Sequence, residues 1–108
     1  MEKLAITIFP KPPKLKELLG ACRLIASQTL EKTGCMDCRV SSGGVDDSAI
    51  QFEQYWRQRH HLDDYFRSDH FNALMGAMKL LAIDFEVAIN DGSPSEGALF
   101  IDRARNKE

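Results

Sequence analysis

Hydrophobic residues follow two different spacings along the chain, and these spacings predict alternating strands and helices. Residues 4–9 alternate branched apolar side chains with smaller or polar ones, which is typical of a half-buried strand. Pro12 and Pro13 then end any strand and suit the first turn of a helix. Over residues 14–30 apolar side chains recur every three or four positions, which predicts one amphipathic helix, and Gly34 is placed to end it.

The middle of the chain predicts a hairpin followed by a second helical region. Residues 35–40 and 49–56 alternate as strands do, and the glycines and acidic residues between them are typical of a turn. Helical spacing returns over residues 57–81. Ser68 interrupts this region and is a good N-cap residue, so two short helices that meet there and one bent helix both fit the pattern.

A last strand, predicted at residues 84–90, completes the order βαββαβ. Two helical regions on one face of a four-stranded antiparallel sheet form an α+β sandwich. The apolar run at residues 97–105 is short enough for either a helix or an added edge strand, and we favour a helix. We expect one domain over residues 1–108, with its core in about residues 3–90.

Composition excludes several classes of protein. The 108 residues are 44% hydrophobic and 28% charged, as in an average soluble globular domain. Fourteen Lys and Arg against sixteen Asp and Glu leave a net charge of −2, which disfavours a nucleic-acid partner. No apolar run is long enough for a membrane span, the N-terminus lacks a signal-peptide pattern, and three cysteines argue against a disulfide framework. We therefore expect a cytoplasmic protein.

The sheet face away from the helices has a mixed set of side chains. If the helices cover Ile6, Ile50 and their neighbours, the reverse face carries small, polar and aromatic residues: Ala5, Thr7, Phe9, Glu53, Tyr55, Glu86 and Ala88. Aromatic residues concentrate at interfaces, so we favour a symmetric homodimer that covers this face. The alternative is a face that lies in water, as in many antiparallel sheets.

Cys35 and Cys38 form a C-x-x-C pair, and His60 and His61 are adjacent, so zinc binding is a natural hypothesis. It is not favoured, because residues three apart on a strand point to opposite faces and would share an ion only if the chain turned there. A thioredoxin-like redox pair opens a helix, whereas this pair opens a predicted strand. We therefore expect neither a metal site nor a redox pair.

Large aromatic and sulfur-containing side chains gather in the second helical region. They either fill the core or line a pocket for a small molecule: Trp56, Tyr65, Phe66, Phe71, Met75 and Met78. Small-molecule sites are mostly apolar with a few placed polar groups, which Tyr65 or His70 could supply. Core packing explains the same residues without a ligand. His60 and His61 lie in a charged stretch that is typical of a solvated helix start.

The order and spacing of three motifs carry a family resemblance. The chain contains Gly34-Cys35-x-x-Cys38-x-Val40, then Glu53-x-x-Trp56, then Leu62-x-x-Tyr65-x-x-Ser68-x-x-Phe71-x-x-Leu74. Over most of its length it resembles the antibiotic biosynthesis monooxygenase superfamily. The resemblance implies ferredoxin-like subunits that pair into a dimeric α+β barrel and oxidise quinols or polyketide phenols with oxygen, without a cofactor. One branch degrades heme, but this chain has Tyr65 in place of that branch's tryptophan and Met75 in place of its heme-ligating histidine.

By the same resemblance, the site residues would bind a phenol or hydroquinone, remove its proton and shield the anion while oxygen reacts. Tyr65 would hydrogen-bond the phenolate, and His70 or Glu53 would accept the proton. The ring of this small aromatic substrate would pack against Trp56, Phe71 and Met75. Many quinol-oxidising relatives carry histidine at the position of Tyr65. The alternative is therefore a dimer of the same fold that binds a small molecule without catalysis or has a structural role.

Overall fold

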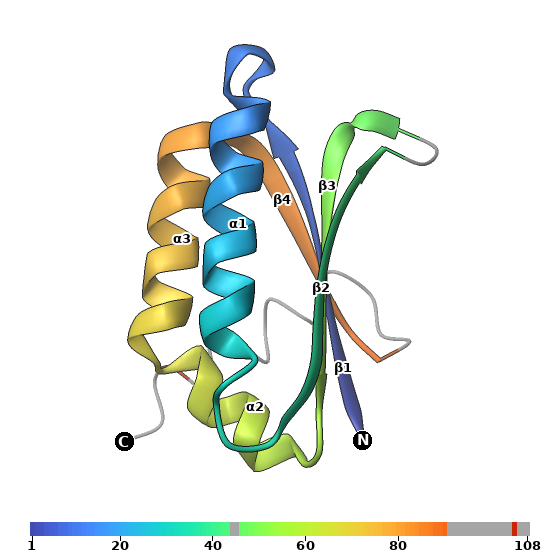
Figure 1. Ribbon diagram of the computed structural model, residues 1–108, viewed down its shortest axis with the longest axis vertical. Helices are drawn as coiled ribbons and strands as arrows, with labels where there is room; N and C mark the ends of the chain where they lie inside the picture. Colours follow the sequence, from blue (N-terminus) through green and yellow to red (C-terminus); the bar gives the residue numbers. More distant parts are fainter. Residues whose placement is uncertain (44–45, 91–104, 106–108) are drawn as a thin grey trace.

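The structure, a computed structural model, describes residues 1–43, 46–90 and 105. It places helices on one face of a four-stranded antiparallel sheet (Figure 1). In chain order the elements are β1 (Glu2–Pro10), the 3-10 turn η1 (Pro12–Lys14), α1 (Leu15–Thr29), β2 (Cys35–Gly43), β3 (Asp46–Trp56), α2 (Arg59–Phe66), α3 (Asp69–Leu81) and β4 (Ala82–Ile89). The predicted order βαββαβ is confirmed, with the second helical region divided into two helices.

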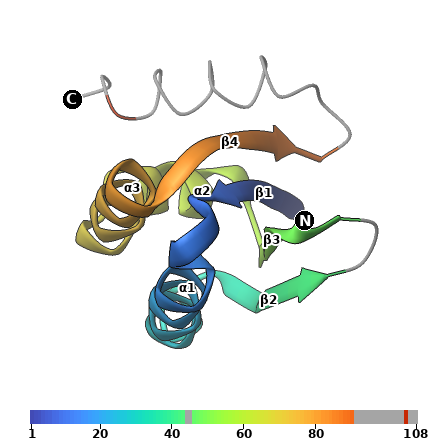
Figure 2. The ribbon, with the colours of Figure 1, turned by 90° about the horizontal axis from the view of Figure 1, so that it is seen from above.

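The strands lie in the order β2-β3-β1-β4, so β1 and β3 are central. Ile6 of β1 lies opposite Phe52 of β3 and Val87 of β4, which puts these three side chains on one face. α1 and α3 pack side by side on that face, and α2 lies at one end of it (Figures 1 and 2). A four-stranded antiparallel sheet with its helices on one face is the ferredoxin-like α+β arrangement that the sequence predicts.

Inward-facing residues of the central strands form one wall of the core. Leu4, Ile6 and Ile8 are buried and alternate with half-buried neighbours along β1, as a period of two predicts. They belong to the same core as apolar residues of the helices, among them Leu18, Cys22, Ile25, Phe71, Leu74 and Met78. Removal of this apolar surface from water is the main force that holds the helices on the sheet.

The break between α2 and α3 falls at Ser68, where the sequence predicts it. The Ser68 hydroxyl accepts a hydrogen bond from the Phe71 backbone N–H at 3.2 Å, which satisfies a free donor at the start of α3. The same hydroxyl donates to the Tyr65 carbonyl at 2.6 Å and so ties the two helices together. Of the two arrangements that fit the pattern, the chain adopts the pair of helices.

α1 covers almost all of the helix predicted at residues 14–30, but it ends well before Gly34. Its last residue is Thr29, and the chain then makes tighter turns, in which the Lys32 N–H donates to the Thr29 carbonyl at 3.0 Å. Gly34 has a φ of +87°, a conformation that favours glycine, at the entrance to β2. The prediction that Gly34 ends the helix is therefore wrong, because the glycine serves the turn into the next strand instead.

The reverse face of the sheet carries the side chains that the alternation predicts. In the register of β1 and β3, Ala5 lies opposite Glu53 on this face. Tyr55 lies between two cations, with the Lys3 ammonium 5.8 Å and the Arg39 guanidinium 5.9 Å from its ring centre. The face is thus mixed in character, and the partner subunit over it stays a prediction.

An irregularity in β2 changes the direction of its cysteines. Cys35 lies opposite Trp56 and Cys38 opposite Gln54, so cysteines three positions apart face partners only two positions apart. The extra residue makes a β-bulge, and both thiols pack against the helix-covered core. The prediction that the cysteines point to opposite faces is therefore wrong, because strict alternation assumes a regular strand.

Most of the C-terminal segment, including the helix predicted at residues 97–105, lies outside the described residues. At Arg105 the guanidinium donates to the Phe66 carbonyl at 2.8 Å and lies 5.7 Å from the centre of the Phe71 ring. None of the helices within the described ranges has both the length and the apolar character needed to cross a membrane.

Candidate functional site

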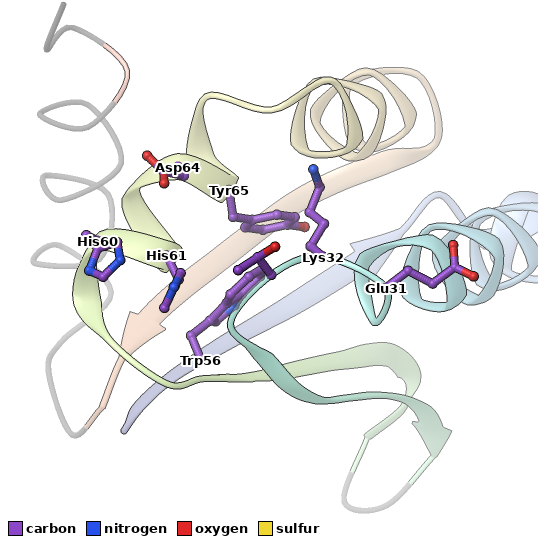
Figure 3. Close-up of a pocket in the computed structure, with 8 residues that line it drawn as sticks. Glu31, Lys32, Trp56, His60, His61, Asp64 and Tyr65 are labelled. Atoms are coloured by element: carbon purple, nitrogen blue, oxygen red, sulfur yellow. The ribbon is translucent and has the colours of Figure 1, made fainter.

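A pocket of about 550 Å³ opens where the turn after α1, the end of β3 and helix α2 meet (Figure 3). Eight residues line it: Glu31, Lys32, Thr33, Trp56, His60, His61, Asp64 and Tyr65. The volume is in the range of sites that hold drug-sized molecules. Because the lining combines aromatic rings with ionisable and hydroxyl groups, it suits an aromatic compound with polar substituents.

The floor of the pocket is formed by Trp56, the last residue of β3, and Tyr65 of α2. Their ring centres are 5.1 Å apart and their planes are inclined by 33°. Each residue is only 1% exposed, so only a small part of either ring borders the pocket. Phe71 packs edge-on against Tyr65 at 5.3 Å and supports it from α3.

Gln54 joins the two floor rings through buried hydrogen bonds. The Trp56 indole N–H donates to Gln54 Oε1 at 3.1 Å, and Gln54 Nε2 donates to the Tyr65 hydroxyl at 2.9 Å. The Tyr65 hydroxyl is also hydrogen-bonded with Thr29, whose own hydroxyl donates to the Ile25 carbonyl at 2.7 Å. Gln54 and Thr29 are fully buried, and these bonds satisfy polar groups that are unfavourable to bury alone.

The sequence predictions missed Gln54, although the chain carries a signal for it. The alternation of β3 points Phe52, Gln54 and Trp56 to the same side of the sheet. A glutamine between two large inward-facing aromatic residues has to find hydrogen-bond partners inside the protein. The neighbouring indole N–H is one partner that the spacing alone identifies.

Burial raises the pKa of Tyr65 well above its usual range. The hydrogen bond from Gln54 lowers the pKa of Tyr65, but by less than burial raises it, and the nearby Cys38 thiol raises it further. Tyr65 is therefore a neutral phenol at physiological pH. It can accept or donate a hydrogen bond, but it cannot serve as a phenolate base.

His60 and His61 form the rim of the pocket in the first turn of α2. Their ring centres are 4.0 Å apart. The His61 ring lies so close to Gly34 that a Cβ at that position would overlap the ring atoms. His61 Nδ1 is buried and has no hydrogen-bond partner within the described part of the chain. Because this nitrogen is buried against Gly34, a ligand would reach it only if the ring moved.

Of the four aromatic and sulfur-containing residues predicted for the site, the pocket brings together two, Trp56 and Tyr65. Phe71 and Met75 lie on α3 and are not among the pocket-lining residues. Phe71 is fully buried and Met75 packs against the core. Both residues pack in or against the core of this chain, and their place in a substrate pocket stays a prediction.

The two predicted proton acceptors lie away from this pocket. His70 is in the first turn of α3, with its Nδ1 buried and unpartnered among the described residues. Glu53 lies on the reverse face of the sheet, where its carboxylate forms a 2.9 Å ion pair with Lys3. Within one subunit, neither side chain lines the cavity beside Tyr65.

The cysteines and histidines do not gather into a ligand set. Over the described ranges, no group of three or more His, Cys, Asp or Glu side chains is placed to hold a metal ion. Burial raises the pKa of the Cys38 thiol to about 12 and also raises that of Cys35. Zinc binds the thiolate form, which this burial disfavours.

No protein-family model matches the sequence, and no curated protein matches it. The fold, in contrast, matches solved structures. A chain named antibiotic biosynthesis monooxygenase is 23% identical, with a TM-score of 0.74 over 87% of this chain and 100% of that one. A provisionally named antibiotic biosynthesis monooxygenase from Deinococcus radiodurans is 16% identical, with a TM-score of 0.78 over 86% of this chain and 93% of that one.

A third similar structure, a conserved protein from Bacteroides thetaiotaomicron named as a candidate oxidoreductase, is 13% identical. Its TM-score is 0.76, over 82% of this chain and 94% of that one. Identities this low show the fold alone. The chain shares the four-stranded α+β fold of these structures, as the motif resemblance predicts.

Proposed function

We propose that the protein is a monooxygenase that oxidises a quinol-like or polycyclic phenolic compound with oxygen and without a cofactor. The observation that carries the proposal is an aromatic-floored pocket in a fold shared with structures named antibiotic biosynthesis monooxygenases. A small aromatic substrate would enter over His60 and His61 and lie against Trp56 and Tyr65 at the floor of the pocket.

In the proposed reaction the substrate supplies all the electrons. Loss of a phenolic proton gives a hydroquinone anion that is able to reduce oxygen. One oxygen atom forms a bond to a ring carbon in place of its hydrogen, and the other leaves as water with two hydrogens of the substrate. The product is a hydroxyquinone, and its four-electron oxidation balances the reduction of both oxygen atoms.

The proton acceptors that line the pocket are the imidazoles of His60 and His61. Imidazole is the side chain best suited to general base catalysis near neutral pH, and His61, which is half-buried whereas His60 is exposed, is our first choice. The Tyr65 hydroxyl accepts from Gln54, so it would keep that bond while its own O–H turned to donate to the phenolate. The roles of His70 and Glu53 stay predictions of the family resemblance.

The test is oxygen consumption by the purified protein with a series of hydroquinones and polycyclic phenols, without added flavin, heme or metal. We expect turnover above the rate of autoxidation, and a fall of about 100-fold in kcat for His61→Asn, since a general base contributes 10²–10⁴-fold. Lys16→Gln, on the exposed surface of α1, serves as the control. If His70→Asn lost activity and His61→Asn did not, the general base would be His70 of α3 and not His61.

A non-catalytic binding protein of the same fold is the second candidate. The observation that favours it is the closed state of Tyr65, which is 1% exposed and already hydrogen-bonded to Gln54. Saturable binding of a phenol with no oxygen consumption would support this second function. An unchanged rate in Tyr65→Phe would remove Tyr65 from the mechanism.

A further inference from the structure

The charged groups around the pocket are not balanced. Two acidic residues and one lysine line it, and they differ in whether they have a partner and in how exposed they are. Asp64 is paired with Arg67, with 2.7 Å between carboxylate and guanidinium. The Glu31 side chain is exposed and points away from the other labelled residues (Figure 3). Both carboxylates are therefore poorly placed to neutralise a cation inside the pocket.

Lys32 has no acidic partner among the described residues. Its side chain is half-buried and extends past the ring of Tyr65 (Figure 3). A partly desolvated ammonium without a counter-charge is unfavourable, and an anion from outside the protein would relieve it. Thr33 and His61 line the same cavity, and their polar side chains add candidate contacts for such an anion.

We infer that the pocket binds a hydroquinone or phenol that carries a carboxylate, with Lys32 as the counter-charge for the carboxylate. The aromatic part of this ligand class rests on the proposed function, whereas the anionic group rests on Lys32 and its surroundings. The volume of about 550 Å³ admits one or two fused rings with a carboxylate at the edge. Lys32 is thus a specificity residue: it selects the substrate and takes no part in proton transfer.

Two probes of the same shape test the inference: 1,4-dihydroxy-2-naphthoate, which is an anion at pH 7, and its methyl ester, which is neutral. Binding is measured by isothermal titration calorimetry under nitrogen, so that oxidation does not consume the probes. We expect the wild-type protein to bind the acid at least tenfold more tightly than the ester. Added NaCl should weaken the binding of the acid and leave the binding of the ester unchanged.

Three variants test whether the preference for the acid over the ester comes from the Lys32 side chain. Lys32→Gln should bind the acid and the ester equally, whereas Lys32→Arg, which keeps the charge, should retain most of the preference. Lys16→Gln removes the same charge from the other end of α1 and should behave as the wild type. Circular dichroism confirms that each variant is folded. Equal binding of acid and ester by the wild type, no binding of the acid, or equal losses in Lys32→Gln and Lys16→Gln would overturn the inference.

Oxygen consumption with the acid separates this inference from the proposed function. Tight binding of the acid that depends on Lys32, with no oxygen consumed, would support the anion site and refute the oxidase role. Turnover of neutral hydroquinones with no preference for the acid would support the oxidase role and refute the anion site. The two failures are therefore distinguishable in one set of samples.

Discussion

Gln54 is the single residue on which the pocket floor most directly depends. It accepts from the Trp56 indole and donates to the Tyr65 hydroxyl, and it is fully buried. Replacement by an apolar residue of similar volume leaves the indole N–H buried without an acceptor. An unsatisfied buried donor is more damaging than a lost hydrogen bond on the surface.

We predict that Gln54→Leu lowers the free energy of unfolding by about 1–3 kcal/mol, the range for a buried polar group left without its partner. Urea unfolding followed by circular dichroism measures the change. Gln28→Leu, on the exposed side of α1, is the control and should change stability by less than about 0.5 kcal/mol. Equal effects of the two substitutions would show that the network does not stabilise the fold.

Gly34 lets the His61 ring lie directly against the backbone. Gly34→Ala would place a Cβ within the ring atoms and force an alanine to adopt a φ of +87°. We predict a loss of more than about 1 kcal/mol, measured as a lower urea midpoint. Gly20→Ala is the matched control, since no atom lies within 4 Å of its Cβ and alanine favours helix, so it should stabilise by about 0.5–1 kcal/mol.

At the scale of elements, hydrophobic spacing and the residues that cap helices or form turns predict most of the helices and strands. The alternation in β1 and the N-cap at Ser68 are local signals, and both elements form as predicted. The helix predicted at residues 14–30 also forms, as α1. The bulge between Cys35 and Asp37 has no local signal, because it is a feature of the pairing of β2 with β3.

The bulge in β2 has a consequence for pH stability. Burial raises the pKa of Cys38 to about 12 and that of Cys22 to about 11, from an ordinary thiol value of 9.0. At pH values between 9.0 and these raised pKa values, the unfolded chain releases thiol protons that the folded chain retains. Stability therefore falls as the pH rises above about 9. Urea midpoints at pH 7.5 and 10 should show this fall, and Cys38→Ala should reduce it; an equal fall in both proteins would contradict the assignment.

At the scale of the whole molecule, the sequence predicts the fold more fully than the site. Hydrophobic periods and motif order suffice for a ferredoxin-like sheet with helices on one face. The pocket needs the turn after α1 brought against α2, and neither periodicity nor the motifs place Lys32 beside Tyr65. Periodicity and motifs also do not show which side chains share a cavity. His70 and Glu53, the proton acceptors predicted from family position, are not among the residues that line the pocket of a single subunit.

The mixed reverse face leads to a prediction for the assembly. If it pairs with a second copy, sedimentation should give about twice the chain mass of 12.2 kDa. Phe9 lies on this face, between buried Ile8 and Pro10, so Phe9→Lys should give the monomer mass. Leu80→Lys, on the exposed side of α3, should leave the mass unchanged. A wild-type monomer at 100 µM would refute the predicted dimer.

The contact between Gly34 and His61 also has an evolutionary consequence. A Cβ at position 34 would overlap the His61 ring, so replacement of the glycine requires the ring to move or the side chain at position 61 to become smaller. The two positions should therefore tend to change together. Among distant proteins of this fold, a glycine before the second strand combined with a histidine in the following short helix would mark those that share this pocket rim.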